Sequence, residues 1–156
     1  MHTMPIVQAP SLALVEIKSS LTESILEQMA DAVIYADETG TIRRWNQAAA
    51  TLFGYSAVEA IGRRLDLIIP EHLRAAHWRG FAAALTNGVI KLQGRPTLTR
   101  AMHQTGRKLY VEMTFALVKE RAEDSALGAV AVARDVTERI EQQRTGAHRD
   151  KPEDSR

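Results

Sequence analysis

The sequence predicts an α+β domain in which short helices lie on one face of an antiparallel sheet. One observation is the order of the expected elements, which runs helix, two strands, several short helices, three strands and a closing helix. Another is the pair of turns at Gly40 and Gly106, each between two β-rich runs, which are typical of antiparallel hairpins. The chain has 156 residues, 45% of them hydrophobic, which is enough for one domain with its own core.

The N-terminal part combines an extension with a short helix. Residues 1–20 are mixed in character, and we interpret them as an N-terminal extension or cap whose apolar run at 12–17 forms a loose strand or a helix. Ser20 and Glu23 have the spacing of a capping box, which predicts a short helix from here through Met29.

A hairpin and a second helix follow. Residues 32–37 and 41–45 are rich in β-forming side chains and flank Gly40, which predicts two paired strands. Asn46 is a good N-cap for a helix over 47–53, because its side chain can accept a hydrogen bond from the first helical turn.

Two more helices are predicted in the middle of the chain. Ser56 and Glu59 repeat the capping-box spacing before a short helix that Gly62 ends. Pro70 is typical of a helix start and precedes a longer helix from 71 to about 85.

The last third of the chain indicates β-structure. Residues 108–117 alternate between apolar and polar, which is the period of a half-buried strand. A less regular strand is expected over about 91–102 and a strand of small and β-branched residues over 128–134. A helix over 136–143 follows, and residues 144–156 are polar and charged, so we expect a disordered tail.

Composition excludes several classes of function. The 20 basic and 19 acidic residues leave a net charge of +1, which gives no electrostatic reason to expect a nucleic-acid partner. The absence of cysteine excludes disulfides, thiolate metal sites, a thiol nucleophile and a flavin–cysteinyl adduct. The longest apolar run, at 126–133, is too short to cross a membrane, so we expect a cytoplasmic protein. No catalytic motif is present, and the sequence does not predict an enzyme or a catalytic residue.

Several segments in order resemble a PAS domain, and the resemblance covers about residues 23–142. The matching segments are DAVIYAD at 31–37, GTIRRWNQAA at 40–49, LFGY at 52–55, EAIG at 59–62 and ARDVTE at 133–138. The resemblance implies a PAS domain over 21–143, with a five-stranded antiparallel sheet flanked by N- and C-terminal helices. In this family the inner sheet face and the helices enclose a ligand pocket, and the domains sense signals or mediate dimerisation.

One segment is similar to the haem-binding PAS domains of oxygen sensors. In those domains a histidine seven residues after a proline binds the haem iron, and the matching residues here are Pro70 and His77. The helical spacing agrees, because His77 lies on one apolar stripe with Leu73, Phe81, Ala84 and Leu85. A histidine on an inward stripe is costly to bury unless it is hydrogen-bonded or coordinated. The alternative is a buried histidine bonded to a backbone carbonyl in a domain without haem.

On the distal side of the expected haem the sequence departs from these relatives. Arg95 stands where one group has a methionine ligand, and Thr97 stands where the family has an oxygen-binding arginine. Arg95 either donates to a bound diatomic molecule or is an ordinary surface arginine. Leu92, Met113 and Phe115 match apolar distal positions that face the pocket.

The resemblance therefore implies a PAS sensory module that binds haem b through His77 and senses a diatomic gas or redox state. It would signal by rearrangement of a homodimer or of the terminal helix, and Asp135 would fix the exit direction of that helix as its cap. A histidine kinase or another effector in trans would receive the signal. The alternative is a haem-free PAS interaction or dimerisation module, with an empty pocket or another small molecule, such as a flavin, in it.

Overall fold

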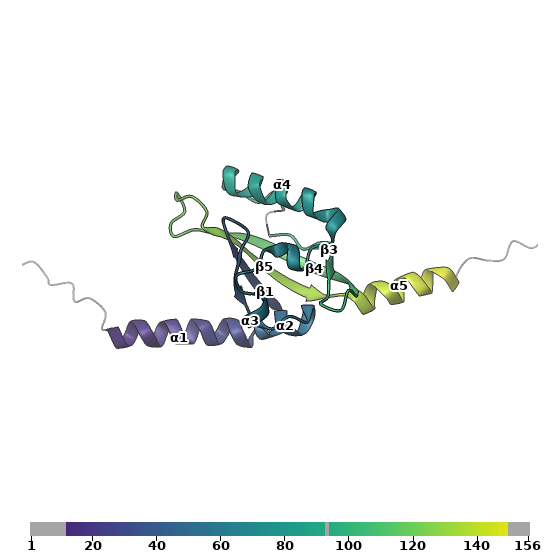
Figure 1. The fold of residues 1–156 in the computed structure, drawn as a ribbon, viewed down its shortest axis with the longest axis horizontal. Coiled ribbons are helices and arrows are strands. Elements are labelled where there is room, and N and C mark those ends of the chain that lie inside the picture. Colours follow the sequence, from purple (N-terminus) through teal and green to yellow (C-terminus); the bar gives the residue numbers. More distant parts are fainter. Residues whose placement is uncertain (1–11, 93, 150–156) are drawn as a thin grey trace, which may run out of the picture.

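The computed structural model describes residues 12–92 and 94–149, and its elements alternate as the sequence predicts (Figure 1). They are α1 (Leu12–Gln28), β1 (Ala32–Asp37), β2 (Ile42–Trp45), α2 (Gln47–Phe53), α3 (Ala57–Ala60), the 3-10 turn η1 (Leu65–Leu67), α4 (Glu71–Asn87), β3 (Thr97–Met102), β4 (Lys108–Val118), β5 (Gly128–Asp135) and α5 (Thr137–Arg149).

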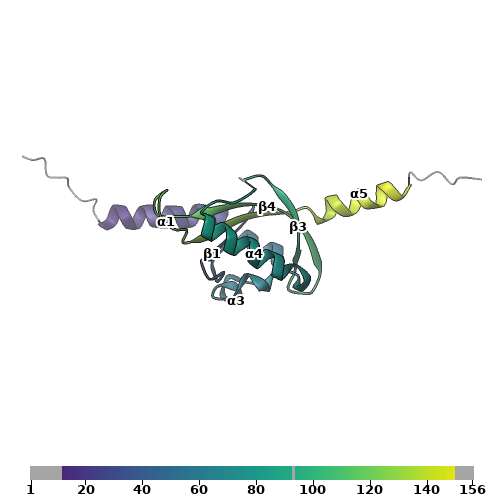
Figure 2. The same cartoon turned by 90° about the horizontal axis from the view of Figure 1, so that it is seen from above.

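The five strands form one antiparallel sheet in the order β2-β1-β5-β4-β3. The first and last strands of the chain, β1 and β5, are therefore neighbours in the interior of the sheet. Helix α4 crosses one face of the sheet, while α1 and α5 extend away from the domain in opposite directions (Figures 1 and 2). The predicted five-stranded antiparallel α+β fold is confirmed.

The core lies between the inner sheet face and the short helices. The alternation along β4 buries Leu109, Val111 and Met113 on this face, as a period of two requires. Phe53 of α2 is fully buried and its ring lies 5.3 Å from that of Trp45. These large side chains are buried on one face of the sheet, and this explains why apolar and polar residues alternate along the strand.

Three boundaries differ from the sequence prediction. Helix α1 is continuous over Leu12–Gln28 instead of starting near residue 20. Strand β3 starts at Thr97 and not near 91, because Gly94 has φ 73° and Pro96 has no N–H to donate to a ladder. Helix α5 continues to Arg149, so residues 144–149, expected in a disordered tail, are helical. Residues 1–11 and 150–156 lie outside the described residues.

Among the described residues, no helix has the length and apolar character that a membrane span needs.

Candidate functional site

A cavity of about 190 Å³ lies between the inner sheet face, η1 and α4. It exists because four inward strand positions carry alanine, at Ala36, Ala101, Ala129 and Ala131, where larger side chains would fill the space. The rest of the lining is mostly aliphatic and aromatic, with four polar residues, Thr97, Thr99, Arg100 and His77, among its described members. An apolar pocket with a few convergent polar groups is typical of a small-molecule site.

Four of the six residues expected to hold a cofactor line this cavity. His77 comes from α4, Thr97 from β3, and Met113 and Phe115 from β4. Thr97 and Met113 are direct cross-strand partners, which places them side by side on the inner face.

The other two expected residues, Leu92 and Arg95, are not among the described lining residues of the cavity. They lie in the loop before β3, where the Arg95 N–H donates to the Leu92 carbonyl at 2.8 Å. Arg95 is exposed.

His77 is held within an aromatic group on α4. Its ring is edge-on to Trp78 at 4.8 Å and roughly stacked on Phe81 at 6.0 Å. Its Nδ1 atom is buried and has no hydrogen-bond partner among the described residues. Burial lowers the pKa of His77, and the negative charge of Asp66 opposes part of this effect. Burial therefore favours the neutral form of the imidazole, and its buried Nδ1 is left without a hydrogen-bond partner among the described residues.

Helix α4 is attached to the domain mainly at one edge. None of its residues, all within the described part of the chain, is buried. Its Trp78 indole N–H donates to the Asp66 carboxylate at 2.9 Å, and the Arg64 guanidinium lies 4.3 Å from the centre of the indole ring. Arg74 donates to the carbonyls of Asp66 and Ile69.

Sequence reasoning missed some of these residues. Thr99 and Ala131 follow the period of two along their strands, so the alternation already used for β4 would have found them. Asp66 and Arg64 carried no such signal, because they meet Trp78 only through the tertiary fold.

The exit of the last helix agrees with the predicted cap. The Thr137 N–H donates to the Asp135 carboxylate at 2.9 Å. The buried Thr137 hydroxyl in turn accepts from the Tyr110 N–H at 3.0 Å, which joins the start of α5 to β4.

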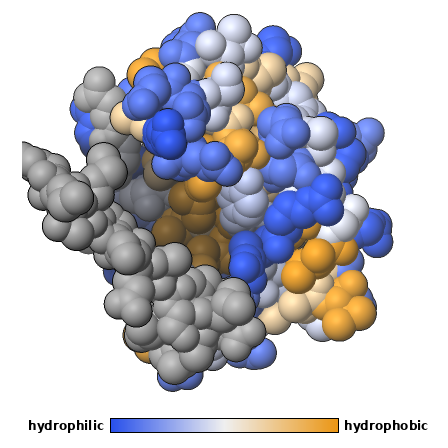
Figure 3. Space-filling view, turned by 90° about the vertical axis from the view of Figure 1, so that its left-hand side faces the viewer, coloured by the Kyte–Doolittle hydropathy of each residue, from blue (hydrophilic) through white to orange (hydrophobic). Residues whose placement is uncertain are grey.

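A second hollow, of about 430 Å³, lies beside α1 on the outer side of the sheet. Its apolar lining includes Leu26 of α1, Val33 of β1, Val118 of β4 and Val130 of β5. Figure 3 views the molecule from the end where α1 projects and shows hydrophobic side chains in a hollow among hydrophilic ones.

The structure shows no group of three or more His, Cys, Asp or Glu side chains within its described residues that could hold a bare metal ion. A sheet whose inner face and helices enclose a small, mostly apolar cavity is an α+β domain with a candidate small-molecule pocket.

Comparison with known proteins identifies the family. A family model described as PAS fold matches residues 26–141, so the chain belongs to the PAS family and is a PAS sensory module. A solved PAS domain from Colwellia psychrerythraea has a TM-score of 0.66 at 23% identity, covering 78% of this chain and 98% of that one. An RNA-binding light-oxygen-voltage receptor has a TM-score of 0.64 at 23% identity, covering 93% of this chain and 41% of that one.

Three curated relatives match parts of this chain, and two of them are named as sensor proteins. The oxygen sensor protein DosP of Escherichia coli is 31% identical over 98 residues, which are 63% of this chain and 12% of DosP. The sensor protein FixL of Bradyrhizobium diazoefficiens is 43% identical over 54 residues, which are 35% of this chain and 11% of FixL. An uncharacterized protein of Azorhizobium caulinodans is 31% identical over 82% of this chain and 17% of its own length. The chain thus spans less than a fifth of each of these three relatives.

Proposed function

We propose that this PAS module binds haem b through His77 and senses a diatomic gas or the redox state of the iron. The observation that carries the proposal is the neutral His77 ring, which lines the cavity with a buried nitrogen that has no partner among the described residues. Neutral imidazole is an axial haem ligand in many proteins, and coordination removes the cost of a buried unpaired nitrogen. The similarity to an oxygen sensor protein supports the same proposal.

The donor chemistry fits haem, but the cavity is smaller than a haem requires, so binding would need α4 to stand further from the sheet. A volume of about 190 Å³ is below the roughly 300–1,000 Å³ of most ligand pockets. An outward shift of α4 would break polar contacts such as the Trp78–Asp66 hydrogen bond, but it would expose no fully buried side chain among the described residues of the helix. Bound haem would supply an iron that binds a diatomic gas or changes its oxidation state.

In this proposal Thr97, Met113 and Phe115 form the distal wall, since all three line the cavity from the sheet. Leu92 and Arg95 belong to the loop before β3 and would contact the haem only from outside the described cavity lining. The Thr97 hydroxyl is the polar group of this wall and would hydrogen-bond a bound gas molecule.

Reconstitution with haemin tests the proposal directly. We expect the wild-type protein to acquire a Soret band and the His77→Ala variant to lose it, because the iron loses its protein ligand. His72→Ala is the matched control, since His72 is exposed on the same helix. The haem proposal would be contradicted if the wild-type protein acquired no Soret band of bound haem. It would also be contradicted if the His77→Ala variant kept the wild-type band unchanged. A flavin spectrum from the purified protein would support the alternative pocket ligand.

Signal output would pass through a homodimer and a histidine kinase or another cytoplasmic effector. Leu21 and Ile25 are one helical turn apart on α1 and are 59% and 56% exposed, so they form a small apolar surface on this helix. Together with the hollow beside α1, they provide an apolar surface that a second copy would cover. A solved neighbour at TM-score 0.61 is a PAS domain from a two-component sensor histidine kinase.

The haem-free interaction module is the second candidate, and the same apolar surface of α1 favours it. We expect Ile25→Glu to convert a dimer into a monomer in light scattering, because a charge would be desolvated at the contact. Val58→Glu, the same kind of apolar-to-charged change at an exposed position of α3, should leave the mass unchanged. An Ile25→Glu protein with the same mass as wild type would contradict a dimer formed through α1.

A further inference from the structure

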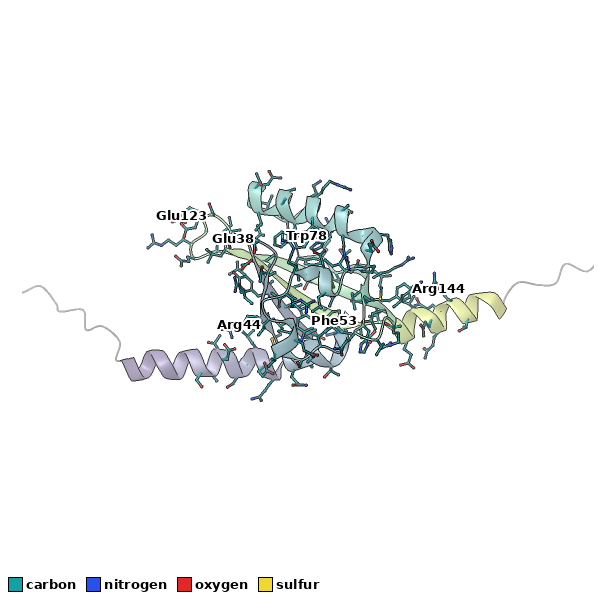
Figure 4. The ribbon with its side chains drawn as sticks, viewed as in Figure 1. Glu38, Arg44, Phe53, Trp78, Glu123 and Arg144 are labelled. Atoms are coloured by element: carbon teal, nitrogen blue, oxygen red, sulfur yellow. The ribbon has the colours of Figure 1, made fainter. Side chains whose placement is uncertain are left out.

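Trp78 and its partners form a polar attachment of α4 that is separate from the cavity lining. We call Trp78, Asp66, Arg64 and Gly40 the Trp78 anchor. The indole N–H donates to the Asp66 carboxylate at 2.9 Å, and the Arg64 guanidinium lies over the ring at 4.3 Å. Figure 4 shows Trp78 on the side of α4 that faces the rest of the domain. A charged acceptor and a cation over the ring both hold an indole more tightly than apolar packing alone.

The ring also sits directly against the turn of the first hairpin. A Cβ atom at Gly40 would lie 2.3 Å from the Trp78 ring, so only glycine leaves room for it. The hairpin turn and the segment before η1 are themselves bonded together, with the Leu65 N–H donating to the Gly40 carbonyl at 3.1 Å and the Ile42 N–H to the Arg63 carbonyl at 2.8 Å. Trp78 therefore rests in a corner whose two walls are joined by backbone hydrogen bonds.

This corner fixes the distance of α4 from the sheet. Within its described length α4 has no fully buried residue, and inward side chains such as Phe81 are only half-buried, so apolar packing holds it less firmly than it would hold a buried helix. His77 precedes Trp78 by one residue, so the same corner sets how far the His77 ring stands from the inner sheet face.

We propose that Trp78 is a positioning residue whose bond to Asp66 and seat against Gly40 hold α4 over the cavity and control the access of large ligands to His77. The access part rests on the proposed haem function, whereas the holding of α4 does not. In ligand-free protein the anchor keeps the cavity at about 190 Å³, and entry of a larger ligand requires Trp78 to leave the corner.

The consequence for signalling follows from what the corner contacts. The hairpin turn leads into β2, where Arg44 pairs with Glu23 of α1. Displacement of Trp78 would free the turn beside Gly40 and change the support of α1, which is the helix with exposed apolar side chains.

Hydrogen exchange of the ligand-free protein tests the anchor without haem. We expect Trp78→Phe and Asp66→Ala to speed exchange of the α4 amides roughly tenfold, because each removes a hydrogen bond to a charged group. Asp66→Asn should fall between wild type and Asp66→Ala, since its amide oxygen still accepts from the indole but carries no charge. Trp45→Phe is the matched control, because the Trp45 N–H bonds the Tyr55 carbonyl away from α4. Unchanged α4 exchange in Trp78→Phe and Asp66→Ala would overturn the proposal.

Haemin uptake, followed by the Soret band, separates the two proposals. Faster uptake by Trp78→Phe than by wild type and Trp45→Phe would support control of access. If wild type binds haemin and Trp78→Phe takes it up at the same rate, the access role is overturned. If α4 exchange rises while neither protein binds haemin, the anchor holds α4 as proposed and the haem function fails.

Discussion

At the scale of single residues, the side chain of Asn46 makes four hydrogen bonds that join three segments of the chain. It is buried, and its Oδ1 atom accepts from the N–H groups of Val33 and Ala49. Its Nδ2 atom donates to the carbonyls of Leu26 and Asp31. One side chain thus caps α2 and joins the end of α1 to β1, which no apolar residue could do.

We expect Asn46→Ala to lower the free energy of unfolding by about 2–4 kcal/mol, since it removes a helix cap and leaves buried backbone groups unpaired. Urea unfolding followed by circular dichroism measures the change. Gln47→Ala, at the exposed neighbouring position, is the control and should change stability by less than about 0.5 kcal/mol. A loss for Asn46→Ala as small as that of the control would show that the four contacts contribute little.

Asn46 also shows how far local sequence reasoning extends. Its capping role was predictable because caps depend on residues within one helical turn. Its bonds to Leu26, Asp31 and Val33 were not, because they join segments 13 to 20 residues apart. The placement of His77 within the cavity lining followed from helical periodicity, whereas the bond between Trp78 and Asp66 depends on the tertiary position of η1.

At the scale of elements, hydrophobic periodicity predicted the type of each element better than the capping and turn signals predicted where it begins and ends. The strict alternation of 108–117 predicted β4 closely, and the observed strand is Lys108–Val118. The capping-box spacing of Ser20 and Glu23 wrongly suggested a helix start, because the residues at 12–19 include no Pro or Gly and the helix already begins at Leu12. Leu92 and Arg95 were predicted to contact the cofactor by resemblance alone. Neither is among the described residues that line the cavity.

The junction of β5 with α5 depends on one buried hydrogen bond, and a single substitution can test its contribution to stability. The Thr137 hydroxyl accepts from the Tyr110 N–H of β4 and is buried. We expect Thr137→Val to cost about 1–3 kcal/mol, because a similar shape remains while the Tyr110 N–H loses its partner. Thr137→Ser retains the hydroxyl, so its free energy of unfolding should fall by less than that of Thr137→Val. Equal stability of Thr137→Val and wild type in urea unfolding would contradict a structural role for this bond.

At the scale of the whole molecule, two carboxylates join sheet segments and link stability to pH. Asp31 pairs with Arg134 across β1 and β5, and the hydrogen bond from Arg134 lowers the pKa of Asp31 although burial opposes it. For Asp37 burial also acts to raise the pKa, but the hydrogen bonds from Thr39, Arg43 and Thr41 outweigh it and lower the pKa to about 2. The Asp37 side chain is only 13% exposed, so it is well shielded from solvent.

Because the folded pKa of Asp37 is below its ordinary value of 3.8, the unfolded chain binds a proton first as the pH falls. The stability contributed by Asp37 is therefore fully present above about pH 5 and decreases as the pH falls toward 2. Urea unfolding of wild type between pH 7 and pH 2.5 should show this decrease. Asp37→Asn should be less stable at pH 7 and should have a flatter acid profile, since the group that titrates has been removed. Glu38→Gln, at an exposed position of the same turn, should keep the wild-type profile. Parallel acid profiles for Asp37→Asn and wild type would show that the hairpin turn does not set the acid limit of the fold.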